Sequence, residues 1–298
     1  MKIFVTGGSG LLGQYLNIEL SKKHEILTQY RNNAGNCKNF NSVKLSITKY
    51  DNIEKIFTSF KPDVVVHTAA VSNPENADEL PAQIVYEINV NATKKLSEFC
   101  EKYKARLVYI STDLVYAGYR GSILNENAKL IPISLYAETK LMGEVKIEET
   151  FDDYVILREA LLIGFGLNHS GNNFQLMYEN LKNGKQIKLF TDQFRTPIAL
   201  HDSARMIMEL IDKNISNEIF NLSGSDRVSR SEIGEIVCDE TGFDKNLIIK
   251  TTMDEAGVRY KVQDVSLSIE KLNSFDIKPL SLHDSIHKII EQYGQRRR

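Results

Sequence analysis

The chain begins with a short apolar run that leads directly into a glycine-rich turn. Residues 2–6 (KIFVT) predict a buried strand, and residues 11–22 repeat leucine at helical spacing. Gly7 and Gly10 lie between the predicted strand and helix, and Gly13 lies in the first turn of the helix, so a glycine occurs at every third position. A strand, a glycine turn and a helix in this order suit a pyrophosphate, because the backbone can approach it closely and its charge lies at the helix N-terminus. The alternative is a glycine-rich turn without a ligand.

Predicted strands and helices alternate through the first half of the chain. The strands are expected at residues 24–28, 63–68, 106–111 and 154–158, and the helices at 51–60, 81–103 (with Pro81 in the first turn) and 135–151. Strands that are apolar throughout indicate parallel pairing with both faces of the sheet covered. With right-handed crossovers, the predicted fold class is α/β, a doubly wound parallel sheet of Rossmann type.

The strict alternation ends near residue 164. Further helices are expected at 173–183, 202–213 and 229–241, the last capped by Ser229 with Glu232, and further strands at 187–190 and 218–222. We interpret the C-terminal third as a smaller interleaved lobe that binds substrate. The expected dinucleotide-binding domain is residues 1–163 plus about 195–222, and the expected substrate-binding lobe is about 164–194 plus 223–298. The terminal arginines 296–298 are expected to form a solvated tail.

Composition and charge exclude several classes of protein. The 37 Lys and Arg residues nearly balance the 39 Asp and Glu residues, so bulk charge favours neither nucleic acid nor acidic lipid as a partner. Cys37, Cys100 and Cys238 are far apart and belong to no Cys/His cluster, so we expect neither a disulfide framework nor a metal site. No apolar run reaches the ~18 residues of a membrane span. The expected location is the cytoplasm.

The end of the second predicted strand indicates which dinucleotide the chain would take. An acidic residue there suits a free ribose 2′-hydroxyl, whereas a basic residue suits a 2′-phosphate. The segment ILTQYRNN carries Arg31 and no acid. This favours NADPH over NADH as the cofactor, with NADH still open and with an ordinary surface arginine as the alternative for Arg31.

A candidate acid–base pair follows the fourth predicted strand. Thr112 lies where that strand ends, at the edge where Rossmann-type sheets bind ligands. Tyr136 and Lys140 lie four residues apart and therefore share a helix face. We expect the lysine ammonium to lower the phenol pKa from about 10 towards working pH. Without the glycine turn and Thr112, the spacing of Tyr136 and Lys140 would be better explained by two side chains on the solvent-exposed face of a helix.

Four ordered segments together resemble the extended short-chain dehydrogenase/reductase family. They are TGGSGLLG at 6–13, DVVVHTAA at 63–70, STDLVY at 111–116 and YAETK at 136–140. Within that family the chain is most similar to the dTDP-4-dehydrorhamnose reductases, through segments such as NVNAT at 89–93, NNF at 172–174 and DVSL at 264–267. The resemblance covers most of the chain to about residue 205.

The resemblance implies NADPH-dependent reduction of a 4-keto-6-deoxy sugar nucleotide in surface polysaccharide precursor synthesis, with Thr112, Tyr136 and Lys140 as the catalytic residues. Tyr136 would protonate the carbonyl oxygen and Thr112 would hydrogen-bond it. The expected cofactor-binding residues are Gly7, Gly10, Leu11, Leu12, Gly13, Arg31, Ala69, Ala70, Ser111, Tyr136 and Lys140. The expected substrate-binding residues are Ser72, Asp113 and Arg195. The resemblance also allows a homodimer.

Two of these residues have an alternative reading. The guanidinium of Arg195 suits diphosphate oxygens, but a structural ion pair is equally compatible with its position. Asp113 would orient the substrate or cap a turn. Outside the expected site, His67 and Cys100 are interpreted as core residues, and Tyr116 and Tyr119 as aromatic loop packing near the substrate cleft.

Three positions depart from the family pattern. Leu161 stands where a substrate-side tryptophan is expected, and Ser46 where an adenine-side acid is usual. Tyr15 replaces the acid that some bacterial members use in a magnesium-bridged dimer. These departures leave open which sugar is bound, how a dimer would form and whether a metal takes part in it. They do not affect the residues expected to carry out the reduction.

Two other functions stay open. A nucleotide-sugar epimerase or dehydratase would share the fold, although dehydratases typically follow the catalytic Ser or Thr with an Asp-Glu pair, and here Asp113-Leu114 follows. An NADP-binding regulatory subunit, resembling that of methionine adenosyltransferase, would use the chain as a partner protein. The retained Thr112, Tyr136 and Lys140 favour catalysis.

Overall fold

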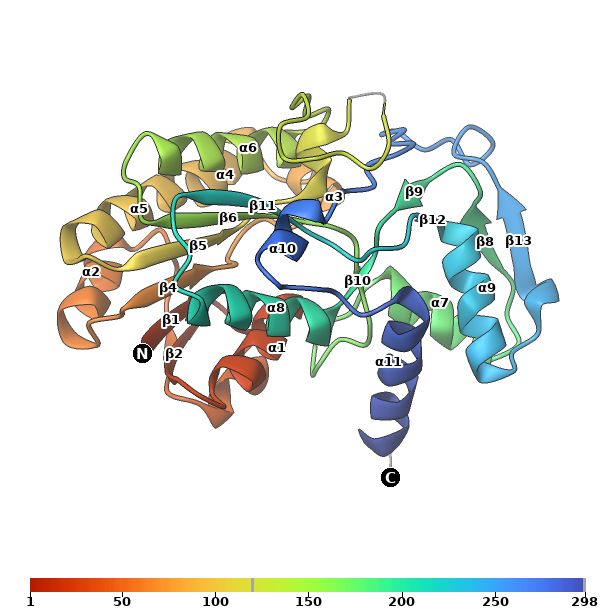
Figure 1. The fold of residues 1–298 in the computed structure, drawn as a ribbon, viewed down its shortest axis with the longest axis horizontal. Helices are drawn as coiled ribbons and strands as arrows, with labels where there is room; N and C mark the ends of the chain where they lie inside the picture. Colours follow the sequence, from red (N-terminus) through yellow and green to blue (C-terminus); the bar gives the residue numbers. More distant parts are fainter. Residues whose placement is uncertain (119–120, 297–298) are drawn as a thin grey trace.

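The computed structural model describes residues 1–118 and 121–296, so the expectations for Tyr119, Arg297 and Arg298 lie outside it. A parallel sheet forms its centre (Figure 1). Its strands are β1 (Lys2–Thr6), β2 (Glu25–Tyr30), β3 (Ser42–Lys44), β4 (Val64–His67), β5 (Arg106–Ile110), β6 (Tyr154–Glu159) and β11 (Glu218–Leu222). The order across the sheet is β11-β6-β5-β4-β1-β2-β3, and each neighbouring pair is parallel. The predicted fold class is confirmed.

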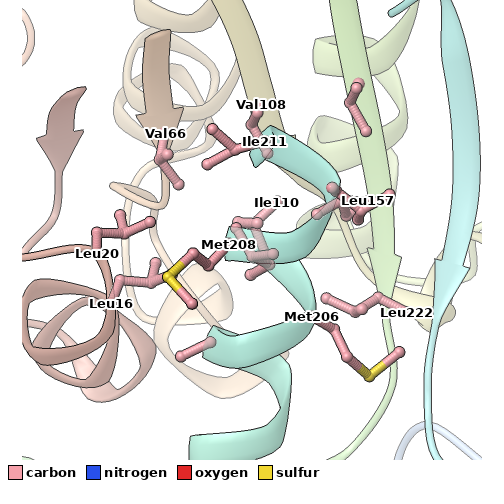
Figure 2. Close-up of a cluster of buried hydrophobic side chains, with 14 of the residues drawn as sticks. Leu16, Leu20, Val66, Val108, Ile110, Leu157, Met206, Met208, Ile211 and Leu222 are labelled. Carbon is pink, nitrogen blue, oxygen red and sulfur yellow. The ribbon is translucent and has the colours of Figure 1, made fainter. Parts of the chain in front are cut away.

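Helices cover both faces of this sheet. One face carries α1 (Leu11–Leu20), α8 (Leu200–Asp212) and α10 (Glu270–Ser274); the other carries α2 (Tyr50–Ser59), α5 (Ala92–Tyr103) and α6 (Leu135–Glu148). Successive strand residues point to opposite faces, so Ile3 and Val5 join the first core while Phe4 joins the second. Figure 2 shows α8 against the sheet, with Met206 and Met208 among the leucines and valines of α1 and the strands.

The strands that follow β1 are placed on both sides of it. The chain first builds β2 and β3 on one side of β1 and then returns to place β4 on the other side. In open α/β sheets, ligands bind in the crevice at the carboxyl ends of the strands beside such a reversal. The glycine turn follows β1 at this edge, and residues 68–70 follow β4 there.

The long helix predicted at 81–103 is confirmed in extent but not in regularity. It consists of α4 (Ala82–Tyr86), a π-helical segment η2 (Glu87–Asn91) and α5. Pro81 precedes the first turn as the N-cap residue, with extended backbone, so the expectation for it was wrong by one position. Within η2, Asn89 accepts from Val71 N at 2.8 Å and donates to Thr139 Oγ1 at 3.1 Å. The irregular turn therefore carries a side chain that ties the loop after β4 to α6.

A second group of elements packs beside the sheet around its own apolar core. It contains α7 (Asn173–Lys182), β8 (Ile187–Phe190), α9 (Arg230–Thr241), β13 (Ile248–Thr251) and α11 (Leu282–Arg296), and Figure 1 shows it at the end of the molecule away from α2. The predicted capping box of Ser229 and Glu232 is present. The strand pairs β7 (Leu162–Ile163) with β10 (Ile198–Ala199) and β9 (Phe194–Arg195) with β12 (Val228–Ser229) complete the small sheets. The proposed division into two domains stays a prediction.

Several elements were not predicted. They are α3 (Pro74–Asp78), α10 and α11, the strands β3, β7, β9, β10, β12 and β13, and the short helices η1 (Gly35–Asn39), η3 (Asp113–Tyr116) and η4 (Lys245–Leu247). Most are too short to show a periodicity. Helix α11 did carry a signal, because Leu282, Ile286 and Ile289 recur at helical spacing and are buried. Arg296 belongs to this helix.

Within residues 1–118 and 121–296, no helix is long and apolar enough to cross a membrane. The same residues contain no group of three or more His, Cys, Asp or Glu side chains arranged to hold a metal ion. Cys37, Cys100 and Cys238 are free thiols in the interior, and burial raises the pKa of each. The core interpretation of Cys100 is confirmed.

Candidate active site

The glycine turn has the geometry of a cradle. Gly7 has a φ of 68°, and a Cβ there would lie 2.7 Å from the Ala69 nitrogen. A Cβ on Gly13 would lie 2.2 Å from the Gly7 carbonyl oxygen, so helix and turn pack too closely for any side chain. Around Gly10 the space is open: a Cβ would meet only that carbonyl oxygen, at 3.1 Å. A ligand could therefore approach the backbone at Gly10.

The N-terminus of α1 faces this open space without a cap. Gly10 is the N-cap residue and offers no side chain. Among the described residues, the N–H groups of Leu11 and Leu12 donate no hydrogen bond. Free N–H groups and the helix dipole together favour an anion, as the pyrophosphate prediction requires.

The other residues expected to hold the dinucleotide lie around the same edge. Ala69 packs against Gly7, and Ala70 follows it, partly buried. Arg31 is exposed just past β2 and, in the part of the chain that the structure describes, forms no ion pair. Ser72 is exposed on the loop after β4, and no described contact joins it to the catalytic residues. The structure thus brings Ala69 to the glycine turn and leaves Arg31 available.

The three predicted catalytic residues come together. Thr112 follows β5 and caps η3, where its hydroxyl accepts from Leu114 N at 3.3 Å. Tyr136 and Lys140 lie on α6, which Ser134 caps. The Tyr136 phenol lies close enough to the Thr112 side chain for that side chain to lower its pKa, and Lys140 is 3% exposed on the same helix. A phenol, a hydroxyl and a buried amine therefore share one site.

The expected lowering of the Tyr136 pKa was wrong for this structure. Burial raises the pKa well above 10, and the charges of Asp113 and Glu159 raise it further, although the Thr112 side chain lowers it. The ammonium of Lys140 lies instead over the Tyr109 ring, 4.0 Å from its centroid. Tyr136 is therefore a protonated phenol, the form that can donate a proton.

Ser111 lies in the site, but its hydroxyl is engaged inside the protein. It donates to Glu144, which also forms a buried ion pair with Arg158 at 2.8 Å. Arg158 in turn donates to the Tyr116 hydroxyl at 2.7 Å. The interpretation of Tyr116 as aromatic packing is confirmed, and this network fixes α6 against β5 and β6.

His67 is a core residue, as expected. Its Nδ1 lies 2.7 Å from Thr6 Oγ1 and its Nε2 lies 3.0 Å from Thr93 Oγ1. Burial, and then the charge of Lys140, lower its pKa to about 3, so the ring is neutral. Through these two contacts, the ring connects Thr6 at the end of β1 to Thr93 of α5.

Asp113 lies near enough to Arg195 of β9 and to Arg230, which follows β12, for their charges to act on it. Asp113 is 5% exposed, and burial raises its pKa to about 6 although Arg195 and Arg230 lower it. Arg195 donates from Nη1 to the carbonyl oxygens of Phe194 at 2.6 Å and Val262 at 3.2 Å. It forms no ion pair within the described chain, so the alternative of a structural ion pair finds no support.

Sequence reasoning missed two charged residues here. Arg230 donates to Gln193 Oε1 at 2.8 Å, and burial and the neighbouring Arg195 lower its pKa to about 9. Nothing in the sequence joins it to Thr112, more than a hundred residues away. Glu159 is the last residue of β6, and its charge acts on Tyr136. An acid at the end of an apolar strand was a usable signal.

Comparisons with known proteins place the chain in a family. The model of the RmlD substrate binding domain matches residues 1–295. A probable low-salt glycan biosynthesis reductase of Haloferax volcanii is 27% identical over 85% of this chain and 84% of its own length. A dTDP-4-dehydrorhamnose reductase of Aggregatibacter actinomycetemcomitans is 27% identical over 83% and 81%. Methionine adenosyltransferase 2 subunit beta of Danio rerio is 25% identical over 91% and 84%.

Solved structures share the fold. A dTDP-4-dehydrorhamnose reductase of Bacillus anthracis in complex with NADP has a TM-score of 0.85 at 22% identity, over 98% of this chain and 99% of that one. A UDP-glucose 4-epimerase of Thermotoga maritima with UDP-glucose has a TM-score of 0.88 at 20% identity, over 100% of both chains. Because the family match spans nearly the whole sequence, the chain belongs to the RmlD substrate-binding domain family, within the extended short-chain dehydrogenases/reductases.

Proposed function

We propose that this protein is an oxidoreductase that reduces the 4-keto group of a 6-deoxy sugar nucleotide with NADPH. The observation that carries the proposal is the meeting of Tyr136, Thr112 and Lys140 at the carboxyl edge of the sheet that also holds the glycine turn. The two reductase relatives, each about a quarter identical to the chain, support the same activity.

The residues present fit a nicotinamide dinucleotide phosphate. The turn of Gly7 and Gly13 and the uncapped start of α1 would hold the pyrophosphate. Arg31 would pair with the 2′-phosphate, and Lys140 would hydrogen-bond the nicotinamide ribose. When bound, NADPH would supply the hydride for the carbonyl carbon.

The protein's own residues would handle the carbonyl oxygen. Thr112 would hydrogen-bond it and stabilise the negative charge that develops there. Tyr136, protonated in this structure, would donate the proton that completes the hydroxyl group. Lys140 would then offset the charge left on the phenol.

Arg195 and Arg230 would bind the diphosphate of the substrate. Both lie near Asp113, next to Thr112, and each guanidinium has N–H groups without a partner in the described residues. Guanidinium groups suit phosphate oxygens because they donate two parallel hydrogen bonds. The substrate class, a sugar nucleotide, follows from this anion site beside a carbonyl site.

The test is NADPH consumption with a panel of 4-keto-6-deoxy sugar nucleotides that differ in base and sugar. We expect turnover with at least one of them and release of the corresponding 4-hydroxy product. Binding of NADPH without turnover on the whole panel would contradict the proposal. It would favour a regulatory binding role, which the likeness to methionine adenosyltransferase 2 subunit beta keeps as the second candidate.

Arg31→Ala is expected to weaken NADPH binding by about tenfold to a hundredfold, since a charged hydrogen bond contributes about 1.5–3 kcal/mol. NADH affinity should stay unchanged, because NADH lacks the 2′-phosphate. Titration of both cofactors by fluorescence measures this, with Arg31→Lys as the charge-retaining control. Equal weakening for NADPH and NADH would remove the argument for a phosphate site.

Arg230→Gln is expected to raise KM for the sugar nucleotide by about tenfold or more, since it removes a charged hydrogen-bond donor from the anion site. NADPH affinity should not change, because Arg230 lies on the side of Asp113 and not at the glycine turn. Steady-state kinetics measure both values. The control is Lys250→Gln, which removes an exposed charge paired with Glu235. An unchanged KM would exclude Arg230 from substrate binding.

A further inference from the structure

The proposed anion site is closed to solvent in this structure. Thr112 is 6% exposed, and Asp113 and Arg195 are each 5% exposed. A sugar nucleotide cannot bring its diphosphate to Arg195 through so little open surface. A part of the chain that covers the site therefore has to move when substrate enters and product leaves, as lids do in many enzymes.

One segment of the smaller lobe borders this site. It comprises residues 252–263, called the strap below, and Figure 1 shows it in blue on the way from β13 to α10. Near the start of the strap, the Met253 sulfur accepts a hydrogen bond from Gln193 Nε2 at 3.4 Å. Gln193 Oε1 in turn accepts the hydrogen bond from Arg230 at 2.8 Å. The start of the strap is therefore fixed beside one arginine of the anion site.

The end of the strap is fixed beside the other arginine, whereas its middle is open to solvent. The carbonyl oxygen of Val262 accepts a hydrogen bond from Arg195 at 3.2 Å, and Met253 and Val262 are both buried. Between these two residues most of the strap is exposed. The strap thus has two fixed ends and a middle part that depends on other contacts.

Asp78, the last residue of α3, provides those contacts. Its carboxylate accepts hydrogen bonds from the Tyr260 hydroxyl at 2.8 and 3.0 Å and forms an ion pair with Arg259 at 2.8 Å. Among the described residues, the other hydrogen bonds of residues 256–261 stay within the strap. Arg259 is largely exposed, so its ion pair contributes less than the two hydrogen bonds of Tyr260.

The contact with Asp78 joins the two sides of the active site. On one side, Ala77 of α3 is buried in a small apolar cluster against which Tyr136 packs. On the other side, Tyr260 packs against a cluster that Leu114, two residues after Thr112, also borders. The strap therefore reaches from the anion site to the helix that packs beside the phenol of Tyr136.

We propose that the strap covers the sugar-nucleotide site and that Asp78 holds it closed through Tyr260 and Arg259. Asp78 is a positioning residue, because it acts on the substrate only through the strap. Substrate enters and product leaves while the contact with Asp78 is open. The proposal rests on the proposed function for the identity of the ligand that the strap encloses.

The first experiment measures the position of the strap in the protein without ligand. Spin labels on Asn76→Cys in α3 and Ala256→Cys in the strap report the distance between these segments by pulsed electron paramagnetic resonance. The three native cysteines are at most 2% exposed, so the labels react with the added thiols. In this background, Asp78→Ala is expected to increase the long-distance population by about tenfold, as the loss of a charged hydrogen bond predicts.

Three further variants separate this contact from general effects on the fold. Tyr260→Phe keeps the ring and removes the hydroxyl, so it should open the strap in the same way by a smaller factor. It provides the test if Asp78→Ala does not fold. Asp78→Glu keeps a carboxylate and should retain most of the closed population. Glu79→Ala removes the exposed acid next to Asp78 and should leave the distances unchanged.

The second experiment measures ligand exchange. The contact closes the free protein and would close again over a bound ligand, so its loss should speed entry and release alike and leave Kd little changed. The probes are thymidine and uridine diphosphates with a fluorescent label on the ribose, added with saturating NADP+, and stopped flow gives both rate constants. In Asp78→Ala both should rise by about tenfold. Damage to the site itself would instead speed release alone.

An unchanged distance distribution in a folded Asp78→Ala protein would overturn the proposal, and so would faster release without faster entry. The outcome can be told apart from that of the proposed function. If the strap opens as expected but the unmodified protein binds neither nucleoside diphosphate, the closure by Asp78 stands and the proposed anion site fails.

Discussion

Tyr136→Phe is expected to lower kcat by about 10²–10⁴-fold, the contribution of a positioned general acid. The change removes the phenol that lies beside Thr112, and with it the proton for the carbonyl oxygen. NADPH affinity should stay nearly the same, because the glycine turn and Lys140 are untouched. Stopped-flow kinetics under single-turnover conditions and a cofactor titration measure the two effects separately.

The control for this substitution is Tyr154→Phe, which removes a buried phenol from β6 away from the site. It should leave kcat unchanged. A Tyr136→Phe enzyme with near-normal turnover would refute the role of Tyr136 as proton donor, even if the protein remained a reductase.

Arg158→Met is expected to destabilise the fold by about 3–5 kcal/mol, the usual cost of leaving one partner of a buried ion pair alone. Arg158 holds Glu144, the Tyr116 hydroxyl and the Glu126 carbonyl oxygen, and it is 3% exposed. Its loss leaves the Glu144 carboxylate buried, with Ser111 as its only remaining donor among residues 1–118 and 121–296. The free energy of unfolding from urea titration measures the effect.

The double variant Glu144→Gln with Arg158→Met tests the reason for this loss. If the unpaired charge causes it, neutralising Glu144 should recover a large part of the stability that Arg158→Met loses. A loss below about 1 kcal/mol in the single variant, the range of an exposed pair, would show that the ion pair is not important for stability.

The sequence predicted the sheet because its strands are apolar on both faces. Val64 and Val66 pack on one side while Val65 packs on the other, so the prediction of parallel strands covered by helices on both faces needed no tertiary information. The glycine turn and the Tyr136–Lys140 pair were predictable for a similar reason, because local spacing determines their geometry. The site residues themselves stay predictions until they are tested.

What the sequence did not predict depends on contacts between distant segments. The pKa of Tyr136 follows from burial and from Asp113 and Glu159, which meet it only in the folded chain. Arg230, at the start of α9, comes near enough to Asp113 for their charges to act on each other. The π-helical segment carries Asn89, which bonds Val71 and Thr139. Periodicity and spacing within one segment do not show which distant residues come close together in the folded chain.

The most direct test of the account follows the hydrogen atom that is transferred. NADPH deuterated at the reactive position of the nicotinamide is incubated with the protein and a 4-keto-6-deoxy sugar nucleotide, and the product is examined by NMR. The account predicts one deuterium at C4 of the sugar for each NADPH oxidised. With Tyr136→Phe it predicts almost no NADPH oxidation and almost no deuterated product in the same time. A product without deuterium at C4, or a sugar changed without NADPH oxidation, would contradict it.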